Sequence, residues 1–227
     1  MSLSSSDDDC TLWRYVSFHE FYALFESKCL PLRSFIDLVS SDSEEGKIPP
    51  TLVDKVLNED FIKQHKEITY VTCWHKSDFE NHLMWRAYAP RGFGIKTTKF
   101  SLSGVLNLAN NAETEEYPSS FVPYDVDYLE DSEFTTFRSG ESPITQILSR
   151  KRKAFFAENE VRFMYLDVQD SISWKTYADC KRWLLVPIKN FEWVKSVHYD
   201  PSLAEWLVDS VMRMLEPYAI QLTKSTG

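Results

Sequence analysis

Apolar residues follow two periods along the chain, and their succession predicts a mixture of strands and helices. Short runs rich in β-branched and aromatic residues predict strands. These runs cover residues 13–16, 29–32, 68–74, 92–98, 121–129, 160–167, 183–188, 193–199 and 219–223. We expect the second strand to lie beside the first. Because the helices between them do not alternate strictly with strands, the pattern predicts an α+β fold with a split mixed β-sheet flanked by helices.

Start signals mark several helices. Ser17 and Glu20 form a capping box, which satisfies free N–H groups at a helix start, and aromatic residues follow at helical spacing. Ser77 and Glu80 repeat this pattern before a second helix. Pro201 stands at the first position of an amphipathic C-terminal helix. Further helices are expected over residues 50–65, 101–109 and 144–156.

Polar segments suggest the organisation of the chain. Residues 1–10 are polar and acidic and predict a disordered leader, so residues 11–227 are expected to form a single domain. Residues 40–50, 110–120 and 130–143 contain the Ser, Gly, Pro and acidic residues typical of loops. We expect the last of these to be a mobile surface loop.

Composition is that of an ordinary globular protein. Of the 227 residues, 43% are hydrophobic and 26% are charged, which excludes wholesale disorder. No apolar run approaches the roughly 20 residues that a membrane-spanning helix needs. The N-terminus lacks the basic and apolar segments of a secretory signal. We therefore expect a cytoplasmic protein with no membrane partner.

Charge and glycine content narrow the choice of ligand. The chain has 25 Lys+Arg against 34 Asp+Glu, and a net charge of −9 opposes nonspecific binding to nucleic acid. It has 6 glycines and neither GxGxxG nor GxxxxGK[ST], so a glycine-rich phosphate loop is excluded. The basic run over residues 150–153 is expected on a solvated helix face, with a local phosphate contact as the alternative.

The cysteines do not form a recognisable site. Cys10, Cys29, Cys73 and Cys180 are scattered without a CxxC pair, which is typical of reduced thiols in a cytosolic protein. Cys73 and His75 share one side of a predicted strand but lie about 7 Å apart, which disfavours a thiol–imidazole nucleophile. His75 and His82 flank a strand–helix boundary, so the sequence does not favour a histidine metal pair.

The string Glu158-Asn159-Glu160-Val161-Arg162 carries the strongest chemical signal. Side chains two apart in a strand point to the same face, so Glu158, Glu160 and Arg162 form a charged row. Such a row is costly in a core unless its members are paired. It is either a solvated face with a Glu–Arg pair, or a cleft. In the cleft, one carboxylate stabilises positive charge on a sugar and the other positions an acceptor.

Aromatic residues surround a second set of candidates. Arg14 stands between two aromatic residues, where a guanidinium makes a cation–π contact or grips a phosphate or carboxylate. Trp74, Trp85 and Tyr88 either wall a pocket that stacks a planar ring or belong to the core. The sequence leaves both interpretations open.

The order of several strings resembles a large uncharacterised bacterial domain family. The strings are LWRYVSF, TCWH, LMWRAY, GFGIKTT and KRKAFFAENEVRF, and a terminal amphipathic helix follows them. The family is marked by an LY+Y opening, a CWS…MW..Y…G.AI middle and a K…W..E.E.R stretch. The resemblance covers residues 12–225 and supplies no known activity.

The candidates are also similar to the motifs of the ADP-ribosyltransferase fold. That fold has an Arg or His on a first strand, a polar-aromatic middle strand and a Glu, often Glu-x-Glu, opening a later strand. The resemblance implies NAD as substrate, with Arg14 holding its pyrophosphate or nicotinamide-side ribose. Glu160 would bind the ribose hydroxyl and stabilise an oxocarbenium-like centre, and Glu158 would orient the acceptor. The remaining cofactor contacts would be Tyr15, Thr72, Trp74, Trp85, Tyr88 and Arg162.

The resemblance leads to a functional expectation. The chain is expected to be a bacterial effector that uses NAD to modify a protein or nucleic-acid target, as a toxin or in antiphage defence. Such chemistry needs a carboxylate near the developing cation, and neither a metal nor a glycine-rich loop. Two alternatives stay open: a noncatalytic module that binds a nucleotide or peptide, and a metal-dependent nucleic-acid-processing enzyme. The latter would use Glu158, Glu160 and Asp167 around a divalent ion.

Overall fold

A computed structural model describes residues 9–38, 45–46, 59–110, 121–135, 137–140, 142–167 and 183–226. The expected leader up to residue 8, the loop over residues 111–120 and Cys180 lie outside the described residues. The chain divides into two compact units. Unit 1 comprises Met1–Leu30, Trp74–Glu115 and Pro187–Gly227, and unit 2 comprises Pro31–Cys73 and Glu116–Val186.

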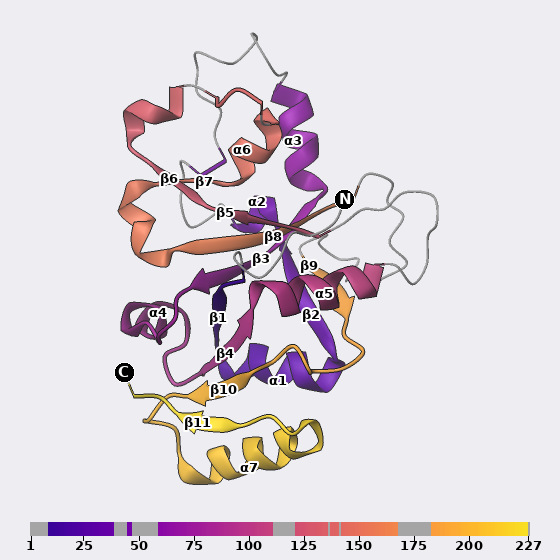
Figure 1. The fold of residues 1–227 in the computed structure, drawn as a ribbon, viewed down its shortest axis with the longest axis vertical. Helices are drawn as coiled ribbons and strands as arrows, with labels where there is room; N and C mark the ends of the chain where they lie inside the picture. The colour runs from indigo at the N-terminus through magenta and orange to yellow at the C-terminus, as the bar shows by residue number, and fades with distance from the viewer. Residues whose placement is uncertain are drawn as a thin grey trace. The chain divides into compact units, whose positions relative to one another are not determined.

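Unit 1 contains the first strand and the C-terminal elements (Figure 1). Its strands are β1 (Thr11–Val16), β4 (Phe93–Thr98), β10 (Ser196–Tyr199) and β11 (Leu222–Lys224), together with the end of β3 (Thr69–Lys76). Its helices are α1 (Phe18–Ser27), α4 (His82–Tyr88), α5 (Lys99–Asn110), α7 (Glu205–Leu215) and the 3-10 helix η3 (Glu216–Tyr218).

Unit 2 contains the middle of the chain. Its strands are most of β2 (Cys29–Ser34) and of β3, with β5 (Val122–Asp125), β6 (Asp127–Leu129), β7 (Arg150–Arg152), β8 (Glu160–Leu166) and β9 (Trp183–Pro187). Its helices are α2 (Phe35–Leu38), α3 (Glu59–Glu67), α6 (Pro143–Leu148) and the 3-10 helices η1 (Asp131–Thr135) and η2 (Lys153–Glu158).

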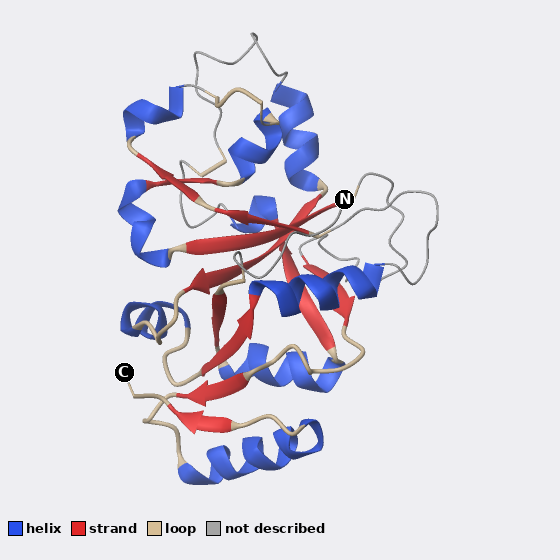
Figure 2. Ribbon diagram, viewed as in Figure 1, coloured by secondary structure: helices blue, strands red, loops and turns tan. Residues whose placement is uncertain are grey.

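Strand pairing confirms the predicted α+β class. Among the described residues a mixed sheet runs in the order β11-β10-β4-β1-β3-β2-β9, with β8 paired to β3 and β5 paired to β8. Most pairs are antiparallel, whereas β10 and β11 are parallel. Figure 2 shows helices interspersed with these strands. The expectation that the second strand lies beside the first is wrong, because β3 pairs with both β1 and β2.

The start of α1 confirms the first capping box. The Ser17 hydroxyl accepts the backbone N–H of Glu20 at 3.3 Å, and the Glu20 carboxylate accepts that of Ser17 at 2.9 Å. The helix then buries Phe21 and Phe25 in the core. Phe21 stacks on Phe93 with ring centroids 4.2 Å apart. Sequence spacing therefore located the start of this helix and two residues of its buried face, whereas Tyr22, predicted on the same face, is 47% exposed.

Two other predicted helix starts are wrong. The second capping box does not form, because α4 begins later, with Asn81 as its N-cap. The Asn81 side chain accepts the N–H groups of Leu83 and Met84. Similarly, α7 begins after Ala204 rather than at Pro201, which lies in a turn.

The predicted helix over residues 144–156 is correct at its start and wrong beyond Leu148. Helix α6 ends at Leu148, the basic run continues as strand β7, and η2 follows. Strand β7 pairs in parallel with β6, so backbone pairing replaces the expected helix. The expected mobile loop over residues 130–143 contains η1, and the N–H of Glu130, which directly precedes this helix, bonds to the Glu133 carboxylate at 2.7 Å.

Candidate functional site

Strand β8 opens with an ion pair between two residues of the predicted charged row. The Glu160 carboxylate accepts two hydrogen bonds from Arg162, from Nε at 2.9 Å and from Nη2 at 3.2 Å. Arg162 is fully buried and also donates to the Leu148 carbonyl at 2.7 Å and to Glu45. Its guanidinium lies 5.8 Å from the centroid of the Phe35 ring. The Glu–Arg pair is therefore real, but it is buried rather than solvated.

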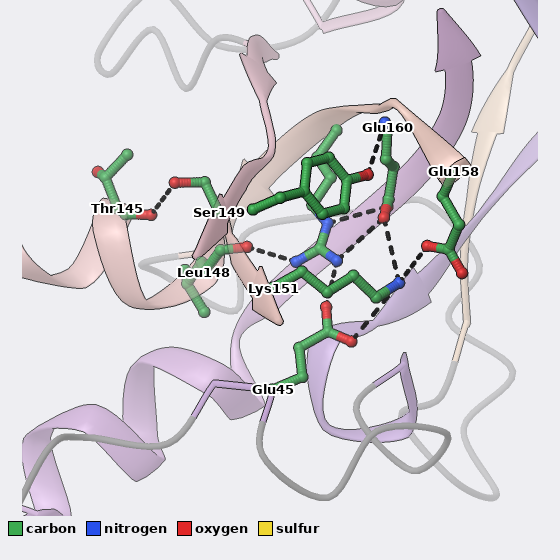
Figure 3. Close-up of polar contacts among 9 residues, drawn as sticks. Glu45, Thr145, Leu148, Ser149, Lys151, Glu158 and Glu160 are labelled. Carbon is green, nitrogen blue, oxygen red and sulfur yellow. Dashed lines mark hydrogen bonds and ion pairs between the residues drawn. The ribbon is translucent and has the colours of Figure 1, made fainter. Parts of the chain in front are cut away.

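Lys151 joins this pair to the remaining carboxylates. Its Nζ lies 2.5 Å from Glu158, 3.4 Å from Glu160 and 3.9 Å from Glu45. Figure 3 shows the lysine side chain reaching between these three carboxylates. The ammonium also lies 5.1 Å from the centroid of the Phe155 ring. Lys151 comes from the basic run, and the expectation that it lies on a solvated face is wrong. We call these five charged residues of unit 2 the charge cluster: Glu45, Lys151, Glu158, Glu160 and Arg162.

The backbone between η2 and β8 brings the two predicted glutamates together. Asn159 adopts the left-handed conformation, with φ of 38°, which Asn tolerates better than most residues. This turn lets Glu158 and Glu160 both reach Lys151, although they belong to different elements. The Tyr128 hydroxyl accepts the Glu160 N–H at 2.8 Å and fixes the start of β8.

Opposite charges control ionisation in the charge cluster. Burial raises the pKa of Glu160, but Arg162 and Lys151 outweigh it and lower this pKa to about 2. Burial raises the pKa of Glu45 more than the two cations lower it. Burial lowers the pKa of Lys151, but the surrounding carboxylates reverse this and raise it above the ordinary value. Glu160 is therefore ionised at neutral pH.

Cys73 contacts the charge cluster without becoming reactive. Its thiol hydrogen-bonds to the Glu160 carboxylate. Burial and the negative charge of Glu160 raise the pKa of this thiol well above its usual value. Because the thiolate is the nucleophilic form, the environment does not favour cysteine catalysis.

The three carboxylates differ in their access to solvent. The Glu45 side chain is 0% exposed, that of Glu160 is 7% exposed and that of Glu158 is 15% exposed. Arg162 and Glu45 form the closed end of the cluster, and Glu158 forms its outer end. Solvent therefore reaches Glu158 more readily than the other two carboxylates.

The predicted aromatic and basic residues of unit 1 make a different set of contacts. Arg14 lies over Trp74, with 5.8 Å between its Cζ and the ring centroid. Trp74, Trp85 and Tyr15 are buried, and the rings of Trp85 and Tyr15 meet edge to face at 5.2 Å. Tyr88 is 50% exposed. The structure thus places both tryptophans in the core, one of the two interpretations left open by the sequence.

Strand β3 contributes a residue to each set of contacts. Trp74 receives Arg14 in unit 1, and Cys73 hydrogen-bonds to Glu160 in unit 2. Thr72, the remaining predicted cofactor contact, is 1% exposed.

Two further findings bear on the sequence-based alternatives. Within the described ranges, no three His, Cys, Asp or Glu side chains are arranged to hold a metal ion. Asp167, which the metal-dependent alternative used, is buried at the end of β8. No helix in the described part of the chain combines the length and apolar character needed to cross a bilayer.

Two members of the charge cluster, Glu45 and Lys151, were not predicted from the sequence. Glu45 lies in a predicted loop, 117 positions before Arg162, and no local pattern marks it. Lys151 belongs to the basic run over residues 150–153, whose composition favoured a solvated helix face. Comparison of the chain with protein-family models, curated proteins and solved structures found no match.

Proposed function

We propose that the chain transfers ADP-ribose from NAD to a protein or nucleic-acid acceptor, at the outer end of the charge cluster. One observation carries this proposal. Lys151 of β7, Glu158 of η2 and the Glu160–Arg162 pair of β8 converge on one ion-pair network. The network leaves Glu158 as its most exposed carboxylate. The similarity of Glu158-x-Glu160 to the ADP-ribosyltransferase motif supplies the choice of NAD.

The chemistry requires a carboxylate beside a developing cation. When the bond between ribose C1′ and the nicotinamide nitrogen breaks, nicotinamide leaves with the electron pair and the ribose becomes oxocarbenium-like. A fixed carboxylate stabilises this charge, and the acceptor then bonds to C1′ and loses a proton. Lys151 holds the Glu158 carboxylate at 2.5 Å, which reduces the reorganisation needed during the reaction.

The difference in solvent access between Glu158 and Glu160 suggests a different role for each. By resemblance, Glu160 would bind the ribose hydroxyl and Glu158 would orient the acceptor. In the charge cluster Glu160 is engaged by Arg162 and Lys151, whereas Glu158 reaches solvent. We therefore propose Glu158 as the catalytic residue that touches the substrate. Glu160 acts as a positioning residue, which fixes Lys151 and the entry to β8.

The test measures release of nicotinamide and transfer of label from NAD in a cell extract. Glu158→Gln is expected to lower both at least 100-fold, while its melting temperature stays close to that of the wild type. Glu130→Gln is the matched control, because Glu130 pairs with Lys153 at the surface and is 59% exposed. If the wild-type chain releases no nicotinamide, the proposal is overturned. NAD that raises the melting temperature without turnover would instead favour the noncatalytic binding module.

A further inference from the structure

A hydrogen-bonded series of three side chains lies in unit 1, independently of the charge cluster. The Ser196 hydroxyl lies 3.1 Å from His198 Nε2, and His198 Nδ1 lies 2.7 Å from the Glu80 carboxylate. An ionised carboxylate can only accept, so His198 donates from Nδ1 and its Nε2 accepts from the Ser196 hydroxyl. We call Ser196, His198 and Glu80 the relay. This order of nucleophile, base and orienting carboxylate is the one used in serine hydrolases.

Neighbouring residues fix both the carboxylate and the ring. Glu80 accepts a second hydrogen bond from Trp85 Nε1 at 3.0 Å and a third from the Ser225 hydroxyl. The imidazole of His198 packs edge to face against Trp13, with centroids 4.9 Å apart. The side chains of Glu80 and His198 are 11% and 15% exposed, so the relay is largely shielded but reaches solvent. The orientation of the imidazole is therefore determined by its surroundings.

A lysine is the cross-strand neighbour of Ser196. Lys96 on β4 lies directly opposite Ser196 on β10, so their side chains leave the sheet on the same face. The Lys96 ammonium lies 5.2 Å from the centroid of the Trp13 ring, which also borders His198. An ammonium in this position favours negative charge on an oxygen that forms beside Ser196.

We propose that the relay is a second catalytic site, which hydrolyses carboxylic esters through an acyl-serine. Ser196 Oγ bonds to the ester carbonyl carbon while its proton passes to His198 Nε2, and Lys96 stabilises the oxyanion. The C–O bond to the alcohol then breaks, and His198 returns the proton to the departing alkoxide. Water attacks the acyl-serine in the same way and releases the acid, which restores Ser196.

The relay was not predicted from the sequence, although two of its members share a strand. Ser196 and His198 stand two apart in the predicted strand 193–199 and alternate with Val197, a pattern that places them on one face. Glu80 lies 118 positions earlier and was assigned to a capping box. The relay uses no residue of the charge cluster, so the proposal does not depend on NAD chemistry.

The test uses a fluorophosphonate probe, which reacts with activated serines, on the full chain, with the labelled position found by peptide mass spectrometry. We expect phosphonylation of Ser196 and hydrolysis of p-nitrophenyl acetate, both lost in Ser196→Ala. His198→Gln keeps a polar side chain of similar size but removes the base, and is expected to lower both at least 100-fold. Glu80→Gln is expected to lower them at least 10-fold.

Controls separate a catalytic relay from a structural one. Ser210→Ala removes a hydroxyl whose hydrogen bonds stay within its own helix, one donated to the Trp206 carbonyl and one accepted from Arg213, and is expected to leave both measurements unchanged. Labelling at Ser196 in the wild type is compared with labelling at Ser210 in the same sample, which requires no variant to fold. Equal labelling of the two serines, or undiminished labelling of Ser196 in a folded His198→Gln variant, would overturn the proposal.

Discussion

Arg162 and Glu160 stand two residues apart on the same face of β8 and form an ion pair with two hydrogen bonds inside unit 2. Both hydrogen bonds run from the planar guanidinium fork to the two carboxylate oxygens, at 2.9 and 3.2 Å. Desolvation of two charges is costly, so a buried pair of this kind is sustained only if the remaining donors are also satisfied. The Leu148 carbonyl and Glu45 satisfy them. The pair is thus one part of a network, and removing one member leaves other charges uncompensated.

Arg162→Met is expected to lower the free energy of unfolding by about 3–5 kcal/mol, because it leaves Glu160 and Glu45 buried with less compensation. Urea denaturation followed by circular dichroism measures the change. Arg138→Met is the control, since Arg138 pairs with Asp127 at 2.8 Å but is 55% exposed, and should change stability by less than about 1 kcal/mol. Similar losses in the two variants would contradict the importance assigned to the buried network.

Glu160 is also expected to make stability depend on pH in the acid range. Its pKa is about 2 in the folded chain against an ordinary value of 4.5, so the unfolded chain binds the proton first. The stabilisation is therefore complete above about pH 4.5 and is lost as the pH falls towards 2, with a total of about 3 kcal/mol. Urea denaturation between pH 2 and 7 should show this acid loss in the wild type and a smaller one in Glu160→Gln. If the free energy of unfolding falls with pH equally in the wild type and in Glu160→Gln, the acid loss does not come from Glu160.

The Cys73 thiol is expected to react slowly with iodoacetamide in the folded chain at pH 8. Burial and the Glu160 carboxylate raise its pKa, so little thiolate is present. Removing the negative charge in Glu160→Gln should increase the rate, whereas Glu130→Gln should not change it. Mass spectrometry of the Cys73 peptide over time measures both rates. A rate in the folded wild type equal to that in urea would show that the thiol is not protected.

The charge cluster shows which parts of a site local pattern can indicate. Alternation in a strand placed Glu160 and Arg162 on the same face, and this prediction was confirmed. The basic run has a composition that suits an exposed helix, so nothing local indicated that Lys151 belongs to a strand with its ammonium turned inward. Glu45 comes from a distant loop, and only tertiary structure brings it to Arg162. Strand periodicity therefore identified the Glu160–Arg162 pair, whereas Lys151 and Glu45 join it only through strand pairing and tertiary contacts that no local pattern indicates.

Helix boundaries failed where tertiary contacts compete for a capping residue. In the first capping box, Glu20 is exposed and its carboxylate accepts hydrogen bonds from Ser17, so the box forms. Glu80 has the same position in the second box, but its carboxylate is occupied by His198 and Trp85. The strand pattern was more robust, since β1, β3, β4, β8 and β9 all lie within a residue or two of their predicted ranges. A strand is specified by several side chains together, whereas a cap depends on one.

The cap of α4 allows this difference to be tested. Asn81→Ala is expected to lower the free energy of unfolding by about 1 kcal/mol, because it removes the acceptor for the N–H groups of Leu83 and Met84. Ser77→Ala should have a smaller effect, since the Ser77 hydroxyl accepts only the N–H of Phe79 ahead of the helix. Urea denaturation of both variants gives the comparison. A larger loss in Ser77→Ala would restore the capping box predicted from the sequence.

Two glycines of unit 1 are expected to respond to alanine in opposite directions. A Cβ at Gly92 would lie 2.2 Å from the backbone carbonyl oxygen of Val16, and a backbone atom cannot yield as a flexible side chain can. Gly92→Ala should therefore lower the free energy of unfolding by about 2–3 kcal/mol. Gly104 lies in α5, and a Cβ there would have no neighbour within 4 Å.

Gly104→Ala is the matched control for this prediction, because it makes the same chemical change in open space. It should raise the free energy of unfolding by about 0.5–1 kcal/mol, since alanine loses less backbone entropy in a helix. For a chain of this length, 1 kcal/mol corresponds to about 2–4 °C in melting temperature, so the two variants should melt on opposite sides of the wild type. A change of the same sign in both would mean that β1 and the start of β4 do not approach as closely as the Gly92 position requires.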